Sequence, residues 1–190
     1  AYNLYDVVNM VVCAGGVPVF ADVERATCNI DPGEIERLVD EDTGAVLITH
    51  LHGLACDVRR ISAICRDRGV PLIEDAAQAF GARVDGQALG TFGAVGVYSF
   101  GSAKNVNSLF GGAVVTRDRQ LHERIGEELA RYRYQETSVL LKRALHCLAF
   151  DILTLPVIFR LLTFWIFRYG RLHDVEAINK TVRTQDNPRL

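Results

Sequence analysis

The feature that most constrains this fold is a series of short apolar runs that alternate with stretches of helical periodicity. Each run is nearly continuous in apolar residues, as is typical of parallel strands covered on both faces. The stretches between them are about ten residues long, which suits crossover helices. We therefore predict an α/β fold of three layers around a mostly parallel sheet. The expected strands are residues 17–23, 45–49, 70–73, 95–100 and 113–115.

Capping residues mark the expected helix boundaries. Asp31 precedes Pro32, so we expect Asp31 as an N-cap with proline at the first helical position. Asp57 is expected to cap a second helix, which Gly69 ends because glycine tolerates the left-handed conformation there. Two further helices are expected at residues 5–14 and 117–134.

Composition limits the class of protein. The chain has 190 residues, 49% hydrophobic and 23% charged, which is enough for one globular domain with an appendage and argues against disorder. The formal net charge of −2 gives no positive field for nucleic acid. The five cysteines include no C-x-x-C pair, which favours reduced thiols in a cytoplasmic protein over disulfides or a zinc site.

A strongly apolar segment at residues 140–167 departs from the alternating pattern. Charged residues and Pro156 interrupt it, and its uncharged stretches are shorter than the roughly 20 residues of a spanning helix. We expect two apolar helices that meet near Pro156. We favour the interpretation that they are buried or contact another subunit. Peripheral contact of residues 140–170 with a membrane is the alternative. The expected organisation is a domain at 1–134, an apolar helical segment at 135–172 and a polar tail at 173–190.

Two segments that follow expected strands carry candidate chemistry. Asp75 comes at the end of an apolar run and Gln78 three residues later, so Asp75 is expected in the ligand crevice at the carboxyl edge of the sheet. The simpler alternative is that Asp75 only caps a following helix. Lys104 follows another strand among small and apolar neighbours, where partial burial would make its amine a nucleophile, although a snorkelling loop lysine is the alternative.

Taken together, the two segments indicate a cofactor. Ser99 and Ser102, with the Gly101 backbone between them, offer hydrogen-bond donors for a phosphate. A carboxylate, a Schiff-base lysine and phosphate-binding hydroxyls are what pyridoxal phosphate requires. The sequence therefore predicts a pyridoxal-phosphate enzyme.

The same segments resemble the DegT/DnrJ/EryC1/StrS family of pyridoxal-phosphate-dependent sugar aminotransferases. The resemblance covers residues 1–118, in the runs GGVPVFADV, IDPGEIERLV, THLHGLACDVRRI, IEDAAQAFGARVDGQALGTFGAVGVYSFGSAKN and GGAVVT. It implies the large domain of the fold type I aminotransferases and a homodimer with each site at the subunit interface. It also implies that glutamate donates the amino group and that a nucleotide-linked keto-sugar receives it.

The resemblance assigns roles to four residues of this sequence. Asp75 would pair with the pyridine nitrogen of the cofactor, and Gln78 would lie near its ring hydroxyl. Ser99 would bind the phosphate, and Lys104 would bind the aldehyde covalently. The family's N-terminal phosphate-binding turn does not occur in the sequence, so we expect a fragment of a larger enzyme.

Three alternatives stay open or are set aside. A cofactor-free regulatory module or a sugar dehydratase of the same fold is the runner-up, and Lys104 argues against it. His50 and His52 lack a third metal ligand at a suitable spacing, so no metal site is predicted, although His50 could approach the cofactor. Glycines at positions 90, 93 and 96 are followed by a strand and not by a helix, so they do not indicate a dinucleotide site.

Overall fold

In the computed structural model the chain forms two compact units, residues 1–134 and 135–190. The residues that the structure describes are 3, 5–101, 104–108, 110–173 and 175. The expected tail at 173–190 falls almost wholly outside them, as does Ser102.

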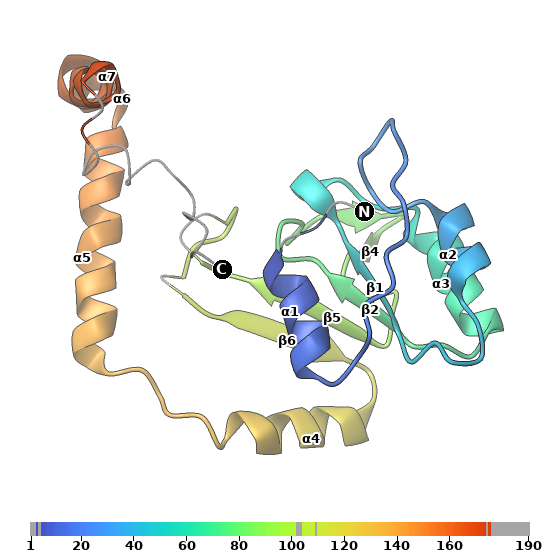
Figure 1. The fold of residues 1–190 in the computed structure, drawn as a ribbon. Coiled ribbons are helices and arrows are strands. Elements are labelled where there is room, and N and C mark those ends of the chain that lie inside the picture. The colour runs from blue at the N-terminus through green and yellow to red at the C-terminus, as the bar shows by residue number, and fades with distance from the viewer. Residues whose placement is uncertain (1–2, 4, 102–103, 109, 174, 176–190) are drawn as a thin grey trace. The chain divides into compact units, whose positions relative to one another are not determined.

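A four-stranded sheet forms the centre of the first unit (Figure 1). Its strand order is β1-β2-β5-β6, with β1, β2 and β5 parallel and β6 antiparallel to β5. The predicted mixed α/β fold with a mostly parallel sheet is therefore confirmed. The strands are β1 (Val46–Thr49), β2 (Leu72–Asp75), β5 (Val95–Ser99) and β6 (Gly112–Thr116), and a separate hairpin pairs β3 (Arg83–Val84) with β4 (Gln87–Ala88).

Capped helices connect these strands. The Asp31 side chain accepts a hydrogen bond from the Gly33 amide, and Asp57 accepts one from Arg60, so both predicted N-caps are confirmed. Gly69 follows the second of these helices with a φ of +68°. The helices of this unit are α1 (Tyr5–Cys13), α2 (Pro32–Leu38), the 3₁₀ turn η1 (Leu51–Gly53), α3 (Val58–Asp67) and α4 (Arg119–Leu129).

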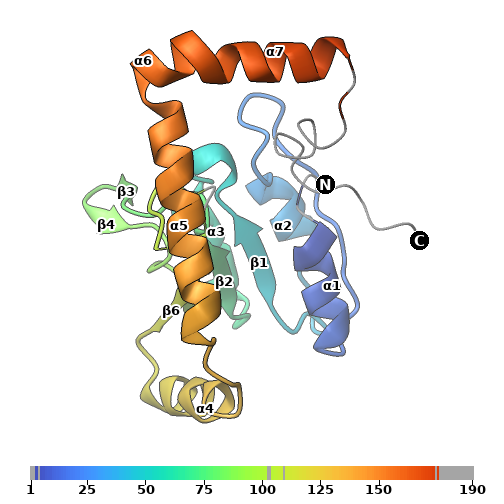
Figure 2. The same cartoon turned by 90° about the vertical axis from the view of Figure 1, so that its left-hand side faces the viewer.

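The two faces of the sheet differ in burial. Ile48, Leu72 and Tyr98 point to one face, here called the core face, where they pack with α2 and α3 in one apolar cluster. Residues at alternate positions form the open face, which is mostly half-buried or exposed. Helix α1 lies on the side of the sheet away from the β3–β4 hairpin, and none of its residues is buried (Figures 1 and 2).

Some predicted boundaries were wrong. Residues 17–23 form no strand: Val17 is 87% exposed, and only Val23 pairs, in an isolated bridge with Ile30. A β-branched run needs a neighbouring backbone, and the sheet offers it none. Strand β2 begins later than expected and extends through Asp75. Helix α4 begins after its N-cap Asp118 and ends at Leu129, so it is shorter than expected at both ends.

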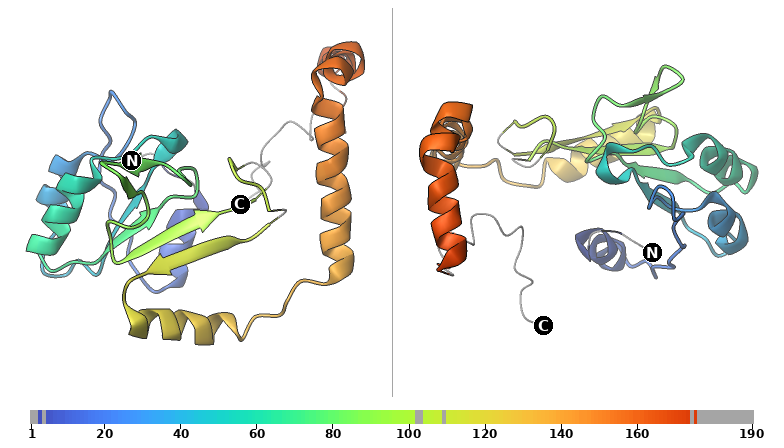
Figure 3. Two further views of the ribbon diagram at one scale, coloured as in Figure 1. Left: turned by 180° about the vertical axis from the view of Figure 1, so that it is seen from behind. Right: turned by 90° about the horizontal axis from the view of Figure 1, so that it is seen from above.

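The second unit is a bent helical arm (Figure 3). The predicted break near Pro156 is confirmed, since Leu155 leaves the helical conformation with a ψ of 132°. No single helix among the described residues is long and apolar enough to cross a membrane. Helix α5 and the helices after Pro156 reach that length and hydropathy only when they are taken together, and they are bent by 66° at the break. The elements are α5 (Thr137–Thr154), α6 (Pro156–Ile158), the π-helical turn η2 (Phe159–Thr163) and α7 (Phe164–Leu172).

Candidate active site

Asp75 ends β2 on the open face of the sheet. Its Oδ2 accepts a hydrogen bond of 3.2 Å from the Thr49 hydroxyl, and its Oδ1 accepts one of 3.0 Å from the Ala77 amide. A turn follows at Ala77 and Gln78, so there is no helix here for Asp75 to cap. Both carboxylate oxygens are thus held in a fixed orientation at the carboxyl edge of the sheet.

Gln78 links the turn after β2 to the turn after β1. Its Oε1 accepts a hydrogen bond of 2.8 Å from the His52 amide, and the side chain is half-buried. A Cβ at Gly53, which has a φ of +77°, would lie 3.2 Å from the Gln78 carbonyl oxygen. The glycine therefore permits the close approach that orients Gln78.

Ser99 and Lys104 come from the end of β5 and the loop beyond it. Ser99 is half-buried on the open face, the face that also carries Asp75. Lys104 is half-buried, and its amide donates to the Gly101 carbonyl over 3.0 Å. Among the described residues, none forms a hydrogen bond or ion pair with the Lys104 amine.

The segments after β2 and β5 are joined directly. The Asn105 side chain donates a hydrogen bond of 2.8 Å to the Phe80 carbonyl. The Phe80 ring packs edge-on against Tyr98 and Phe100, with centroids 5.3 and 5.1 Å away. Asp75 and the loop that carries Lys104 therefore lie at the same edge of one sheet.

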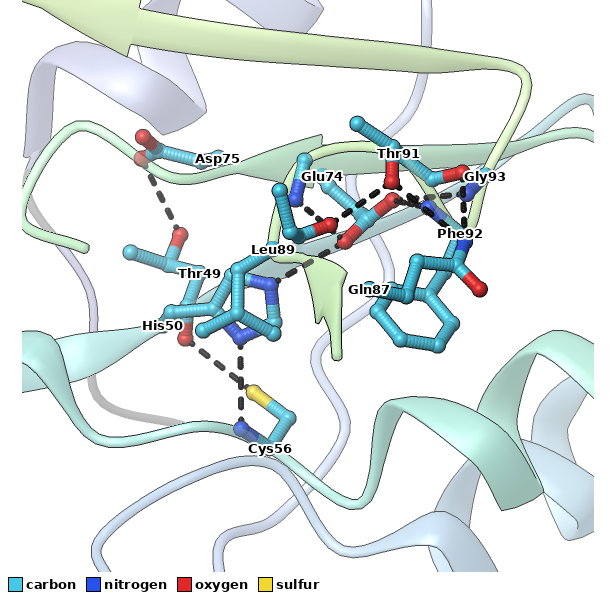
Figure 4. A network of polar contacts seen from close by, with 12 residues as sticks. Thr49, His50, Cys56, Glu74, Asp75, Gln87, Leu89, Thr91, Phe92 and Gly93 are labelled. Carbon is cyan, nitrogen blue, oxygen red and sulfur yellow. Dashed lines mark hydrogen bonds and ion pairs between the residues drawn. The ribbon is translucent and has the colours of Figure 1, made fainter. Parts of the chain in front are cut away.

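A second polar cluster lies on the core face, with Glu74 at its centre (Figure 4). The fully buried Glu74 carboxylate accepts hydrogen bonds from the amides of Gly90 (2.8 Å), Phe92 (2.6 Å) and Gly93 (2.6 Å). His50 Nε2 lies 3.3 Å from the same group. Burial raises the pKa of Glu74, but these hydrogen bonds outweigh burial and hold the pKa below its usual value.

The His50 ring belongs to this buried cluster and not to the open face. Its Nδ1 accepts a hydrogen bond of 3.2 Å from the Cys56 amide, so the proton sits on Nε2 and is donated to Glu74. Burial raises the pKa of the Cys56 thiol to about 12, which makes that thiol unreactive. Both ring nitrogens of His50 are used inside the protein, so the expectation that His50 could approach the cofactor was wrong. No group of three potential metal ligands occurs among the described residues.

Sequence reasoning missed Thr49, which holds Asp75, and Glu74, which is the centre of the buried cluster. The available signal for Glu74 was a charged residue inside an apolar strand, because such a residue is rarely buried without partners. Gly90 and Gly93 lie in the loop around Glu74, where the chain turns so that their backbone amides donate hydrogen bonds to its carboxylate. The spacing of these glycines therefore serves an internal anion and not a nucleotide.

The mostly parallel sheet, with a fixed carboxylate and a half-buried lysine at its carboxyl edge, is an α/β domain whose candidate site lies where open sheets of this class bind ligands. The family model "DegT/DnrJ/EryC1/StrS aminotransferase family" matches residues 3–136. The chain belongs to this family.

Relatives and solved structures agree with that assignment. The chain is 38% identical to the GDP-perosamine synthase of Vibrio cholerae over 57% of this chain and 30% of the relative. It resembles the structure of Helicobacter pylori PseC, an aminotransferase involved in the biosynthesis of pseudoaminic acid, with a TM-score of 0.63 and 30% identity over 65% of this chain and 33% of that one. The structure of an E. coli GDP-4-keto-6-deoxy-D-mannose-3-dehydratase with bound hydrated pyridoxal phosphate (PLP) is also similar, with a TM-score of 0.62. It is 27% identical over 65% of this chain and 32% of that one. The chain spans about a third of the length of the curated relatives it matches.

Proposed function

We propose that this chain forms the cofactor-binding part of a pyridoxal-phosphate-dependent aminotransferase that acts on a nucleotide-linked keto-sugar, with glutamate as the amino donor. The observation that carries the proposal is the placement of Asp75 and Ser99 on one face of the sheet, at the ends of two neighbouring strands. The hydrogen bond from Asn105 to Phe80 holds the Lys104 loop at the same edge.

The residues fit the chemistry of the cofactor. A carboxylate with both oxygens oriented suits a protonated ring nitrogen, and the Ser99 hydroxyl suits a phosphate oxygen. The Lys104 amine has no hydrogen-bond or ion-pair partner among the described residues, so none of them competes with an aldehyde for this amine. When bound, pyridoxal phosphate supplies an electron sink for the carbanion at the α-carbon of the amino acid.

Each residue then has a separate task. With pyridoxal phosphate bound, Asp75 would keep the proton on the ring nitrogen, and Ser99 would anchor the phosphate. Gln78 accepts a hydrogen bond from the His52 amide through Oε1. Its Nε2 group is therefore left to donate to the ring hydroxyl of the cofactor. The Lys104 amine would bind the aldehyde of the cofactor, and it would move the proton at the α-carbon of the amino acid.

A sugar dehydratase or a cofactor-free regulatory protein is the second candidate. The structural likeness to a dehydratase supports it. The lysine at position 104 favours the aminotransferase, because its amine is the group that would bind the aldehyde of the cofactor and move a proton in transamination.

The direct test is to add pyridoxal phosphate, reduce the product with borohydride and map the modified peptide by mass spectrometry. The chain has three lysines, at positions 104, 142 and 180, so the labelled residue is identified without ambiguity. We expect a yellow adduct on Lys104 that the substitution Lys104→Ala removes. The matched control Lys142→Ala should keep the adduct, and labelling only at another lysine would refute the assignment.

We also propose that the protein works as a homodimer in the cytoplasm. The half-buried open face is the side that a second subunit would cover, and the lack of a C-x-x-C pair among the five cysteines suits a reducing compartment. Sedimentation velocity over a range of concentrations tests the dimer, and a monomer throughout would contradict it.

A further inference from the structure

The helical arm of residues 137–172 exposes apolar side chains along its whole length. No residue of α5 is buried, and Leu141, Leu145 and Leu148, which share one face, are 59%, 57% and 56% exposed. The exposed set continues through Leu155, Val157, Leu161, Leu162, Trp165, Ile166 and Leu172. A continuous apolar surface of this kind marks an interaction site, whereas single exposed leucines do not.

The arm also carries an excess of positive charge. Between residues 137 and 172 the acidic side chain is Asp151, against the basic Lys142, Arg143, Arg160, Arg168 and Arg171. The three arginines of the second half are all exposed. A second copy of the arm would bring like charges together, which disfavours self-association through this surface. An anionic surface complements it.

The bend is built into the arm. The Thr163 hydroxyl, in a residue only 4% exposed, donates a hydrogen bond of 2.7 Å to the Leu153 carbonyl near the end of α5. Pro156 begins the next helix, and the two halves meet at 66°. With 18 residues, α5 is about 27 Å long, and it carries Lys142, Arg143 and Asp151. This geometry suits helices that lie in a membrane interface better than a straight span.

Aromatic and basic groups alternate in the second half, as at the headgroup level of a bilayer. Trp165 is 57% exposed, and the Arg168 guanidinium lies 5.8 Å from the centre of its ring. Phe164 packs edge-on against Trp165, with ring centroids 5.5 Å apart. Tryptophan, with an apolar body and a polar N–H, is enriched where hydrocarbon meets headgroups.

We propose that residues 137–172 bind the surface of a bilayer that contains anionic phospholipids. The apolar side chains enter the acyl boundary, and the arginines pair with lipid phosphates. The family match ends at residue 136, so the arm lies outside the matched region and the proposal does not depend on the aminotransferase activity.

The chain provides its own reporter, because Trp165 is its single tryptophan. The full chain is mixed with vesicles of phosphatidylglycerol and phosphatidylcholine, and separately with vesicles of phosphatidylcholine alone. We expect the anionic vesicles to shift the Trp165 emission to shorter wavelength, protect it from acrylamide and allow quenching by lipids brominated on their acyl chains. An unchanged spectrum and unchanged acrylamide quenching would overturn the proposal.

Two variants test the two parts of the surface. Replacing Arg160, Arg168 and Arg171 by glutamine should weaken binding to the anionic vesicles roughly 100-fold, because each basic residue contributes about fivefold. The matched control replaces Arg66, Arg124 and Arg133 by glutamine, removes the same charge from the first unit and should bind as the parent does. Equal loss in both would contradict a specific role for the arm. The substitution Leu161→Asp, at a side chain 72% exposed and so without a packing role, should also release the protein.

Self-association through the apolar surface of residues 137–172 would give a different fluorescence result. Trp165 would then be shielded from acrylamide without lipid, increasingly so at higher protein concentration, and vesicles would change nothing. That result would assign the surface to self-association and overturn membrane binding.

Discussion

The Thr49 hydroxyl donates a hydrogen bond of 3.2 Å to Oδ2 of Asp75, between residues that lie opposite each other in the β1–β2 pair. The same hydroxyl accepts a hydrogen bond of 3.0 Å from the Asn3 side chain. Thr49 is only 7% exposed, so its rotamer is fixed by packing as well as by these bonds. Thr49 thus positions the carboxylate that we assign to the cofactor nitrogen.

Replacing Thr49 by valine should weaken the binding of pyridoxal phosphate roughly fivefold, since the variant keeps the shape and loses one hydrogen bond of about 1 kcal/mol. An absorbance titration with the cofactor measures this. Thr49→Ser keeps the hydroxyl and should restore most of the affinity. A serine variant as weak as the valine variant would show that packing, and not the hydroxyl, holds Asp75.

Replacing Asp75 by alanine in the full-length enzyme should lower the kcat of transamination by about 100-fold or more, because the ring nitrogen loses the charge that stabilises its proton. Cofactor affinity should fall much less, since the phosphate and the lysine still hold the cofactor. Both quantities are measured on one preparation, kcat with glutamate as donor and affinity by titration. Equal losses would reduce Asp75 to a positioning role.

Replacing Glu74 by glutamine should lower the free energy of unfolding by about 2–4 kcal/mol, because the new amide N–H groups face backbone donors inside the core. The exposed Glu123→Gln is the control and should change stability by less than about 0.5 kcal/mol. Urea denaturation followed by circular dichroism gives both values.

The same variant should change how stability depends on pH. The pKa of Glu74 is lower in the folded protein than its ordinary 4.5, so its stabilisation is complete above that pH and is lost as the pH falls through the folded-state pKa. The parent should therefore lose more stability than Glu74→Gln between about pH 5 and pH 3. Parallel curves would show that the carboxylate is not charged in the core.

Local signals in the sequence were enough to predict the capped helices and the mostly parallel sheet. Asp31, Asp57 and Gly69 act through their nearest neighbours, so their roles can be predicted from sequence alone. The strand at 17–23 failed because pairing is not local: whether Val17 has a backbone beside it depends on the whole fold. The placement of Asp75 followed from the rule that ligand sites form at the carboxyl ends of parallel strands.

The assignment of the two neighbouring acids to opposite faces could not be predicted in full. Strand alternation puts Glu74 and Asp75 on different faces, but it does not tell which face the helices and the following loop cover; that depends on the packing of the whole unit. The backbone amides that bind Glu74 come from a loop sixteen to nineteen residues away in sequence, and no local sequence pattern predicts them.

Gly96 lies on β5 so close to the preceding loop that a side chain there would strike the Gly90 carbonyl oxygen. The substitution Gly96→Ala should therefore displace the loop whose amides hold Glu74 and lower the free energy of unfolding by about 3 kcal/mol or more. The control is Gly126→Ala in α4, where a Cβ meets nothing within 4 Å. That change should stabilise the protein by up to about 1 kcal/mol, because alanine is the better helix former. Urea denaturation of the two variants under the same conditions separates the effects, and a loss of similar size in both would mean that the contact between β5 and the loop does not limit stability.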